Sequence, residues 1–206
     1  MNINFTTTAM ARPEIVERTY QSFSQNIKGI SLKECDLYIN IDPIEGRDSR
    51  EVISIGERYF NRVVSNVPKK PNFTKAVNWC WSSANSDFIL HLEDDWVLTS
   101  PIDIKQLINK KMKGKVKQIM LRAYKYKYEK MALSPSIIKR DLYKSFVDKF
   151  DFNLNPEIQL RKEWVSPSNI SVSGKGIVVK DIGRKWIKKT QYSKPDKKSK
   201  FTSWRI

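Results

Sequence analysis

Apolar and polar positions follow two different periods along the first half of the chain. Four short runs are rich in β-branched and aromatic residues and predict strands. They cover residues 2–8, 36–41, 62–67 and 87–92. Between them, apolar residues recur every three to four positions and predict helices. These helices cover residues 12–26, 52–60 and 72–84, and Pro13 suits the first turn of the first one.

Strand and helix therefore alternate, which favours right-handed crossovers and a mostly parallel sheet with helices on both faces. The expected fold class is α/β of the Rossmann type, with its ligand crevice at the carboxyl ends of the strands. Further along, the pattern predicts a helix that starts at Ser100-Pro101, a strand over 116–128 and a helix over 136–150. The glycines of the tail, at 174, 176 and 183, suggest a loop that could order over a bound ligand.

Size and composition point to one globular domain with a C-terminal appendage. The chain has 206 residues, of which 40% are hydrophobic, enough for a sizeable core. Because no long apolar span or signal-peptide pattern is visible, the expected location is the cytoplasm, which would be the host cytoplasm if the protein is viral. Cys35 and Cys80 form no Cys-x-x-Cys pair, so they are expected to be core residues.

Positive charge gathers in two blocks. Of the net charge of +16, residues 105–130 carry +9 (ten Lys/Arg against one acid) and residues 175–206 carry +9 (eleven against two), so the rest sums to −2. Such blocks indicate a polyanionic partner, while a solvated lysine-rich surface is the plain alternative. Tyr124, Tyr126 and Tyr128 alternate with Lys125 and Lys127, an arrangement that could hold an acceptor or simply form a half-buried strand.

Three consecutive carboxylates, Glu93, Asp94 and Asp95, end the last of the four strands. Charged acids cannot enter a core without partners, so we expect them at the exposed carboxyl end of the strand. Their expected companion is Mn²⁺ or Mg²⁺, which favours oxygen ligands and completes its shell with substrate phosphates and water. A strand that runs into a polar loop would look the same.

Under this topology Thr6, Thr7, Thr8 and Asp42 should meet the acids at one edge of the sheet. The chain has neither Gly-x-Gly-x-x-Gly nor Gly-x4-Gly-Lys-Ser/Thr, so the usual dinucleotide and P-loop sites lose their support.

The order of these features resembles GT-A glycosyltransferases, especially the family 2-like type. It comprises Thr-Thr-x-x-x-Arg-Pro after the first strand, Asp42 ending the second, the helical stretch from Asn72 to Asn78, and Glu93-Asp94-Asp95 ending the fourth. The resemblance covers about the first 100 residues and implies a GT-A-like fold. It also implies that residues 1–104 form the nucleotide-sugar-binding half of one domain, that 105–174 form its acceptor-side half, and that 175–206 form a basic tail.

The resemblance also implies roles for individual residues. Asp95 would ligate Mn²⁺ or Mg²⁺ on the donor diphosphate, with Glu93 and Asp94 beside the donor. The nucleoside would be surrounded by Thr7, Thr8, Arg12 and Asp42, with Lys75 near the base or phosphates. As alternatives, the threonines are ordinary strand residues, Arg12 and Lys75 are surface charges, and Asp42 forms a turn before Pro43.

The acceptor-side base is expected after the triplet. Glu157 is the first candidate and Glu163 the second, although either could cap or pair at a helix start. Many metal-dependent relatives supply a downstream histidine to the cation, but His91 precedes the triplet in an apolar strand, where a core role is favoured.

Together these features predict a metal-dependent glycosyltransferase that uses a nucleotide-sugar donor. The two basic blocks favour hydroxymethylated DNA as the acceptor, by analogy with phage enzymes that glycosylate DNA. The alternatives are a glycosyltransferase of cell-surface glycan or lipid, and a nucleic-acid-binding protein without catalysis.

Overall fold

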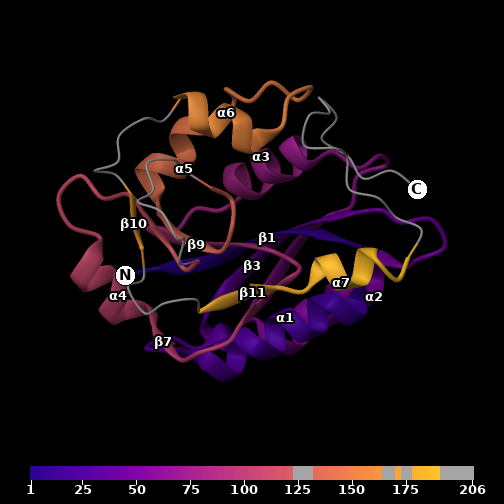
Figure 1. The fold of residues 1–206 in the computed structure, drawn as a ribbon, viewed down its shortest axis with the longest axis horizontal. Helices are drawn as coiled ribbons and strands as arrows, with labels where there is room; N and C mark the ends of the chain where they lie inside the picture. Colours follow the sequence, from indigo (N-terminus) through magenta and orange to yellow (C-terminus); the bar gives the residue numbers. More distant parts are fainter. Residues whose placement is uncertain (123–131, 164–169, 173–177, 191–206) are drawn as a thin grey trace.

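The computed structural model of the chain describes residues 1–122, 132–163, 170–172 and 178–190 (Figure 1). A seven-stranded sheet with the order β10-β8-β9-β5-β1-β3-β4 forms its centre. The four strands predicted in the first half of the chain are present and mutually parallel. They are β1 (Ile3–Met10), β3 (Asp36–Asp42), β4 (Arg62–Asn66) and β5 (Phe88–Glu93).

Helices cover both faces of this sheet, as the alternating pattern predicted (Figure 1). One face carries α1 (Pro13–Asn26) and α2 (Ser49–Tyr59), whose apolar sides pack on Phe5, Leu37 and Ile39. The other face carries α3 (Phe73–Ser83), α5 (Arg140–Phe146) and α6 (Pro156–Glu163). There Trp81, fully buried, lies in a second cluster with Tyr143 and Leu160.

Two of the later helix predictions are wrong. Residues 136–139 form strand β9 (Ser136–Lys139), which lies antiparallel between β5 and β8 (Gln118–Met120), and the helix α5 starts only at Arg140. Ile137 and Ile138 are both fully buried, because the two faces of this central strand are covered, so the segment lacks an alternating pattern.

The other wrong helix start is at Ser100-Pro101. Residues 102–103 instead form β7 (Ile102–Asp103), which pairs with β2 (Ile27–Lys28). The helix α4 (Ile104–Lys111) begins after Asp103, whose Oδ1 accepts a hydrogen bond from the Gln106 N–H at 2.8 Å. Of the strand predicted over 116–128, β8 covers 118–120, and the three interleaved tyrosines lie outside the described residues.

The remaining elements are η1 (Leu32–Glu34), β10 (Ile170–Val172), β6 (Trp96–Leu98), β11 (Val179–Asp181) and α7 (Gly183–Ile187). Strand β6, which directly follows the acidic triplet, forms a small antiparallel pair with β11. Gly183 does not belong to a loop, as the tail pattern suggested, but begins α7, whereas Gly174 and Gly176 lie outside the described residues. The described part of the basic tail thus packs against the domain.

Candidate active site

The carboxyl ends of β1, β3 and β5 bring the predicted polar residues to one edge of the sheet. Met10 is the register partner of Asp42, and Thr8 is the partner of Glu93. The backbone N–H of Asp94 donates to the Thr8 carbonyl at 3.1 Å, and that of Ala11 donates to the Asp42 carbonyl at 3.0 Å. The expected convergence of these residues therefore follows directly from the strand register.

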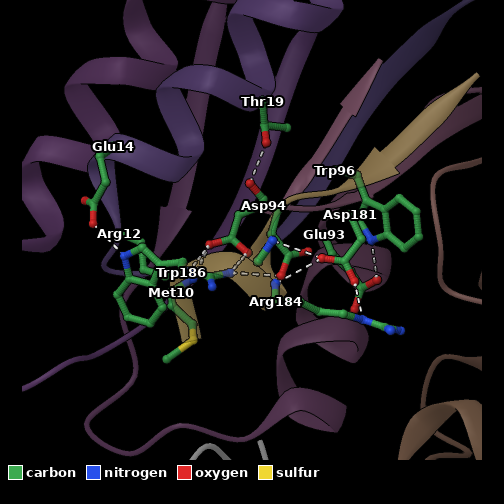
Figure 2. A network of polar contacts seen from close by, with 12 residues as sticks. Met10, Arg12, Glu14, Thr19, Glu93, Asp94, Trp96, Asp181, Arg184 and Trp186 are labelled. Atoms are coloured by element: carbon green, nitrogen blue, oxygen red, sulfur yellow. Dashed lines mark hydrogen bonds and ion pairs between the residues drawn. The ribbon is translucent and has the colours of Figure 1, made fainter. Parts of the chain in front are cut away.

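Arg12 and Asp94 form the centre of this edge (Figure 2). Arg12 is 1% exposed and Asp94 3%. The Arg12 guanidinium donates through Nε to Asp94 Oδ2 at 3.1 Å and through Nη2 to Oδ1, while the Met10 N–H donates to Oδ2 at 3.0 Å. The Thr19 hydroxyl, on α1, donates to the Asp94 carbonyl at 2.6 Å. Although burial opposes its charge, the two neighbouring carboxylates raise the pKa of Arg12, so the guanidinium stays protonated.

Asp95 lies between Arg12 and the start of α7. Its Oδ2 is 3.4 Å from Arg12 Nη2, and its carbonyl accepts a hydrogen bond from the Ile182 N–H at 2.8 Å. A Cβ added at Gly183 would lie 1.9 Å from Asp95 Oδ2, so only glycine allows α7 to approach this closely. Asp95 is 5% exposed, and α7 covers it.

Glu93 faces away from this ion pair, toward β6. Its Oε2 accepts a hydrogen bond from Trp96 Nε1 at 2.9 Å (Figure 2). Its side chain is only partly buried. The three acids therefore do not share one environment.

Trp186 holds α7 onto the domain. Its indole Nε1 donates to Glu14 Oε1 on α1 at 2.7 Å, and Arg12 lies over its ring with Cζ 5.1 Å from the centroid. The Arg47 guanidinium lies 5.4 Å from the same ring and also binds both Glu14 oxygens at 2.9 Å. Asp181, at the end of β11, binds the start of α7: its Oδ1 accepts from the N–H of Gly183 at 2.9 Å and its Oδ2 accepts from Arg184 Nε at 3.0 Å.

A second group of polar side chains surrounds Asp42. Asn66 donates to Asn40 Oδ1 at 2.6 Å, and Asn40 donates to Asp42 Oδ1 at 2.9 Å. Burial raises the pKa of Asp42 to about 7, the Asp94 charge adds to this rise, and hydrogen bonds from Asn40 and the Asn72 backbone oppose it. Asp42 can therefore change charge near neutral pH.

The start of α3 lies beside Asp42. Asn72 caps this helix by accepting from the Lys75 N–H at 2.9 Å. Lys75 is exposed, one turn into the helix, with its Nζ 5.6 Å from the Phe152 ring centroid. Thr7 and Thr8 are buried on β1, and the Thr8 hydroxyl has no hydrogen-bond partner among the described residues. The helix α3, Asp42 and β1 thus bound a polar corner beside the triplet.

The base candidates lie on the face of the sheet opposite α1. Glu157 is in the first turn of α6, where its backbone N–H donates to Asn155 Oδ1 at 2.9 Å. The loop before α6 is tied to α3, since Thr74 donates to the Leu154 carbonyl at 2.6 Å. Glu163 is the last residue of α6, and its side chain lies outside the described part.

His91 is a core residue. It is fully buried on β5, and its Nδ1 lies 2.9 Å from the Thr6 hydroxyl. Burial lowers its pKa to about 3, so the ring is uncharged at neutral pH.

Sequence reasoning missed the contribution of Glu14, Trp186, Asp181 and Arg184 to this site (Figure 2). The run from Asp181 to Trp186 carried one usable signal, because an Asp two residues before Gly183 is a helix-starting pattern. No local pattern indicates that this short helix packs on residues about 90 to 170 positions earlier.

The geometry of the triplet does not form the expected metal site. Among the residues that the structure describes, no group of three or more His, Cys, Asp or Glu side chains is placed to hold a metal ion. Asp94 is bound by Arg12 and the Met10 N–H, Asp95 is covered by Gly183, and Glu93 turns toward Trp96. In this arrangement the three carboxylates do not fit a shared cation.

No protein-family model and no curated protein sequence matches the chain. Solved structures do match it. The crystallised fragment of S. aureus TarS superposes with a TM-score of 0.62 and 14% identity, covering 86% of this chain and 59% of that one. The complex of this fragment with UDP-GlcNAc superposes with a TM-score of 0.61 and 14% identity, covering 86% of this chain and 57% of that one.

The mannosyltransferase PcManGT from Pyrobaculum calidifontis, in complex with GDP-Man and Mn²⁺, superposes with a TM-score of 0.59 and 9% identity, covering 83% of this chain and 56% of that one. This chain thus spans less than two thirds of these neighbours. The likeness confirms the predicted fold class, a GT-A-like sheet flanked by helices. No helix in the described ranges is long and apolar enough to cross a membrane.

Proposed function

We propose that the protein is a glycosyltransferase that moves a sugar from a nucleotide-sugar donor to an acceptor hydroxyl. The observation that carries the proposal is the meeting of Thr8, Asp42 and Glu93–Asp95 at the carboxyl edge of a GT-A-like sheet. Ligands of open α/β sheets bind at this edge. Both neighbours named above have solved structures in complex with a nucleotide sugar, UDP-GlcNAc for TarS and GDP-Man for PcManGT.

The polar corner around Asp42 would bind the nucleoside. An ionised Asp42, oriented by Asn40, can accept a hydrogen bond from a base N–H. The Thr8 hydroxyl, which has no hydrogen-bond partner in the described part of the chain, can donate or accept one. Thr7 precedes Thr8 on β1 with its side chain on the opposite face of the sheet, and Lys75 would add an exposed cation near the phosphates. Arg12 acts as a positioning residue that fixes Asp94. Glu93 and Asp94 are proposed to lie beside the donor.

Chemically, the reaction needs an acceptor oxygen to lose its proton while the diphosphate leaves with the bonding electrons. A carboxylate can take that proton, and Glu157 is proposed for this role, with Glu163 second. Asp95 is kept as the proposed ligand of a donor-bound Mn²⁺ or Mg²⁺ ion, which would require Arg12 and Gly183 to move from its Oδ2.

For the acceptor we propose hydroxymethylated DNA, on the strength of the two basic blocks. A cell-surface glycan or lipid acceptor would use the same donor chemistry. The second candidate function is a nucleic-acid-binding protein without catalysis. It is favoured by the Arg12–Asp94 pair, which neutralises an acid of the triplet without any substrate.

The test is a donor screen with and without Mn²⁺. UDP-GlcNAc, UDP-glucose and GDP-mannose are added singly, and both thermal stabilisation and released nucleoside diphosphate are measured. We expect one donor to raise the melting temperature and to be turned over, since a ligand that binds only the folded state stabilises it. Asp42→Ala should remove the stabilisation, whereas Glu51→Ala, at an exposed acid on α2, should not.

If no donor stabilises or is consumed, the glycosyltransferase proposal fails and the binding protein remains. Loss of Mn²⁺ dependence in Asp95→Asn, with donor binding retained, would support Asp95 as the metal ligand. Unchanged Mn²⁺ dependence in Asp95→Asn would show that Asp95 is not the metal ligand.

A further inference from the structure

A cavity of about 500 Å³ opens between α1, β6, β11 and α7, next to the acidic triplet. Its apolar wall includes Ile15, Val97 and Ile182. Its charged lining includes Arg18 from α1, Lys180 from β11, and Lys185 and Lys189 from α7 and the turn after it. Four cations therefore surround one concave space.

The cations of this lining are not neutralised by the acids beside them. Glu14 and Asp181 also line the cavity, but each is bound by an arginine outside the lining: Arg47 binds Glu14 at 2.9 Å and Arg184 binds Asp181 at 3.0 Å. Within the described part of the chain, Arg18, Lys180, Lys185 and Lys189 form no ion pair with an acid. The cavity thus keeps a positive charge that an anion could satisfy.

The walls of the cavity are held in place without a ligand. Lys180 is the register partner of Val97 across the β11–β6 pair, so both face the same space. The Trp186–Glu14 hydrogen bond, 2.7 Å long, and the Ile182–Asp95 hydrogen bond, 2.8 Å long, fix α7 against α1 and the turn between β5 and β6. The backbone that carries the exposed cations is therefore fixed before a ligand binds, which lowers the entropy lost on binding.

We infer that this cavity binds the phosphodiester backbone of a single nucleic-acid strand. Lysine meets phosphate as a point charge, and three of the four cations are lysines. A concave space favours an extended single strand over a bilayer, which needs a flat or protruding basic surface. The lining carries four cations against two acids that are both paired with arginines, so it does not favour a metal ion. Because β6 directly follows Asp95, a nucleic-acid strand bound in this cavity would pass beside the acidic triplet. The inference deepens the proposed function by placing the acceptor.

The test compares two triple variants that remove the same charge. The cavity variant combines Lys180→Gln, Lys185→Gln and Lys189→Gln. The α4 variant combines Lys110→Gln, Lys111→Gln and Lys113→Gln, at the exposed end of α4 in the other basic block. Binding of a labelled twelve-nucleotide oligothymidylate is followed by fluorescence anisotropy from 50 to 200 mM NaCl. Circular dichroism melting checks that both variants are folded.

We expect the cavity variant to bind at least about tenfold more weakly at low salt. Its plot of log affinity against log salt should be shallower by about 2, since each phosphate contact on a single strand contributes about 0.7 to the slope. The α4 variant should change affinity by less than about threefold. Equal losses in both variants, or no binding by the unaltered protein, would overturn the inference.

Vesicles containing phosphatidylserine form the second arm. If the cavity variant loses vesicle binding but keeps oligonucleotide binding, the cavity serves a membrane and the inference is wrong. The assays contain no donor, so a failure of glycosyl transfer would not alter their outcome. A protein that binds the strand through this cavity but turns over no donor would refute the proposed function alone.

Discussion

Arg12 and Asp94, 82 residues apart, form a buried ion pair in which Nε lies 3.1 Å from Oδ2 and Nη2 contacts Oδ1. The pair joins the start of α1 to the end of β5 and lies under Trp186 of α7. It connects three segments that meet at the candidate active site.

Removing the Asp94 charge should be costly, because Arg12 would remain buried without its main partner. We expect Asp94→Asn to lower the free energy of unfolding by about 3–5 kcal/mol in urea titrations. Asp141→Asn is the matched control, since its pair with Lys117 is half exposed and should be worth about 1 kcal/mol or less. Similar losses of unfolding free energy in the two variants would show that the Arg12–Asp94 pair stabilises the fold no more than an exposed pair does.

Donor binding should depend on pH through Asp42. Its pKa of about 7 in the free protein means that the carboxylate is protonated in acid and must lose that proton to accept from a base N–H. We expect donor affinity, measured by calorimetry from pH 5.5 to 8.5, to be flat above pH 7 and to fall about tenfold per unit well below it. Asp42→Asn should bind weakly at every pH, while Glu51→Gln should keep the profile. A flat profile in the unaltered protein would exclude Asp42 from the donor site.

His91 should stay uncharged in mildly acidic solution. It is the chain's one histidine, and burial lowers its pKa to about 3. Its folded pKa is below the unfolded value of about 6.5, so its contribution to stability is present above pH 6.5 and is lost as the pH falls toward 3. Asp42 acts with the opposite sign, since its folded pKa is raised, so the melting temperature cannot isolate the histidine. We therefore expect the imidazole NMR shifts to be constant from pH 8 to pH 5; a midpoint near 6.5 would contradict its burial.

A side chain at position 183 should separate α7 from the triplet. The new Cβ of Gly183→Ala would meet Asp95 Oδ2 at 1.9 Å, which no real Cβ tolerates. We expect faster hydrogen exchange over residues 178–187 and a melting temperature lower by several degrees. Lys188→Ala, at an exposed position just after α7, serves as the control and should change neither. Unchanged exchange in Gly183→Ala would show that α7 does not depend on this contact.

Local patterns were sufficient for the first half of the fold. Strands β1, β3, β4 and β5 and helices α1, α2 and α3 were expected within a few residues of their observed bounds, because each has one face or both faces in the core. The segment 136–150 was misread because Ile137 and Ile138 are buried on both sides, which removes the alternation that distinguishes a strand.

The candidate site also has one part that local patterns predict and another that they do not. That Thr8, Asp42 and Glu93 share an edge followed from parallel strands, whose carboxyl ends lie together. The contacts of the three acids could not be predicted in this way, because they depend on side-chain directions and on the docking of distant segments. Arg12 binds Asp94, Trp96 binds Glu93, and Gly183 covers Asp95.

The sequence by itself determined the alternating α/β fold, the edge where the acids gather and the two blocks of positive charge, because periodicity and charge are local properties of the chain. Only the tertiary structure decided which acids are neutralised and which cations are left to line a cavity. Those outcomes depend on contacts between residues about 80 to 170 positions apart, such as Arg12 with Asp94 and Glu14 with Trp186, whose geometry no local pattern specifies.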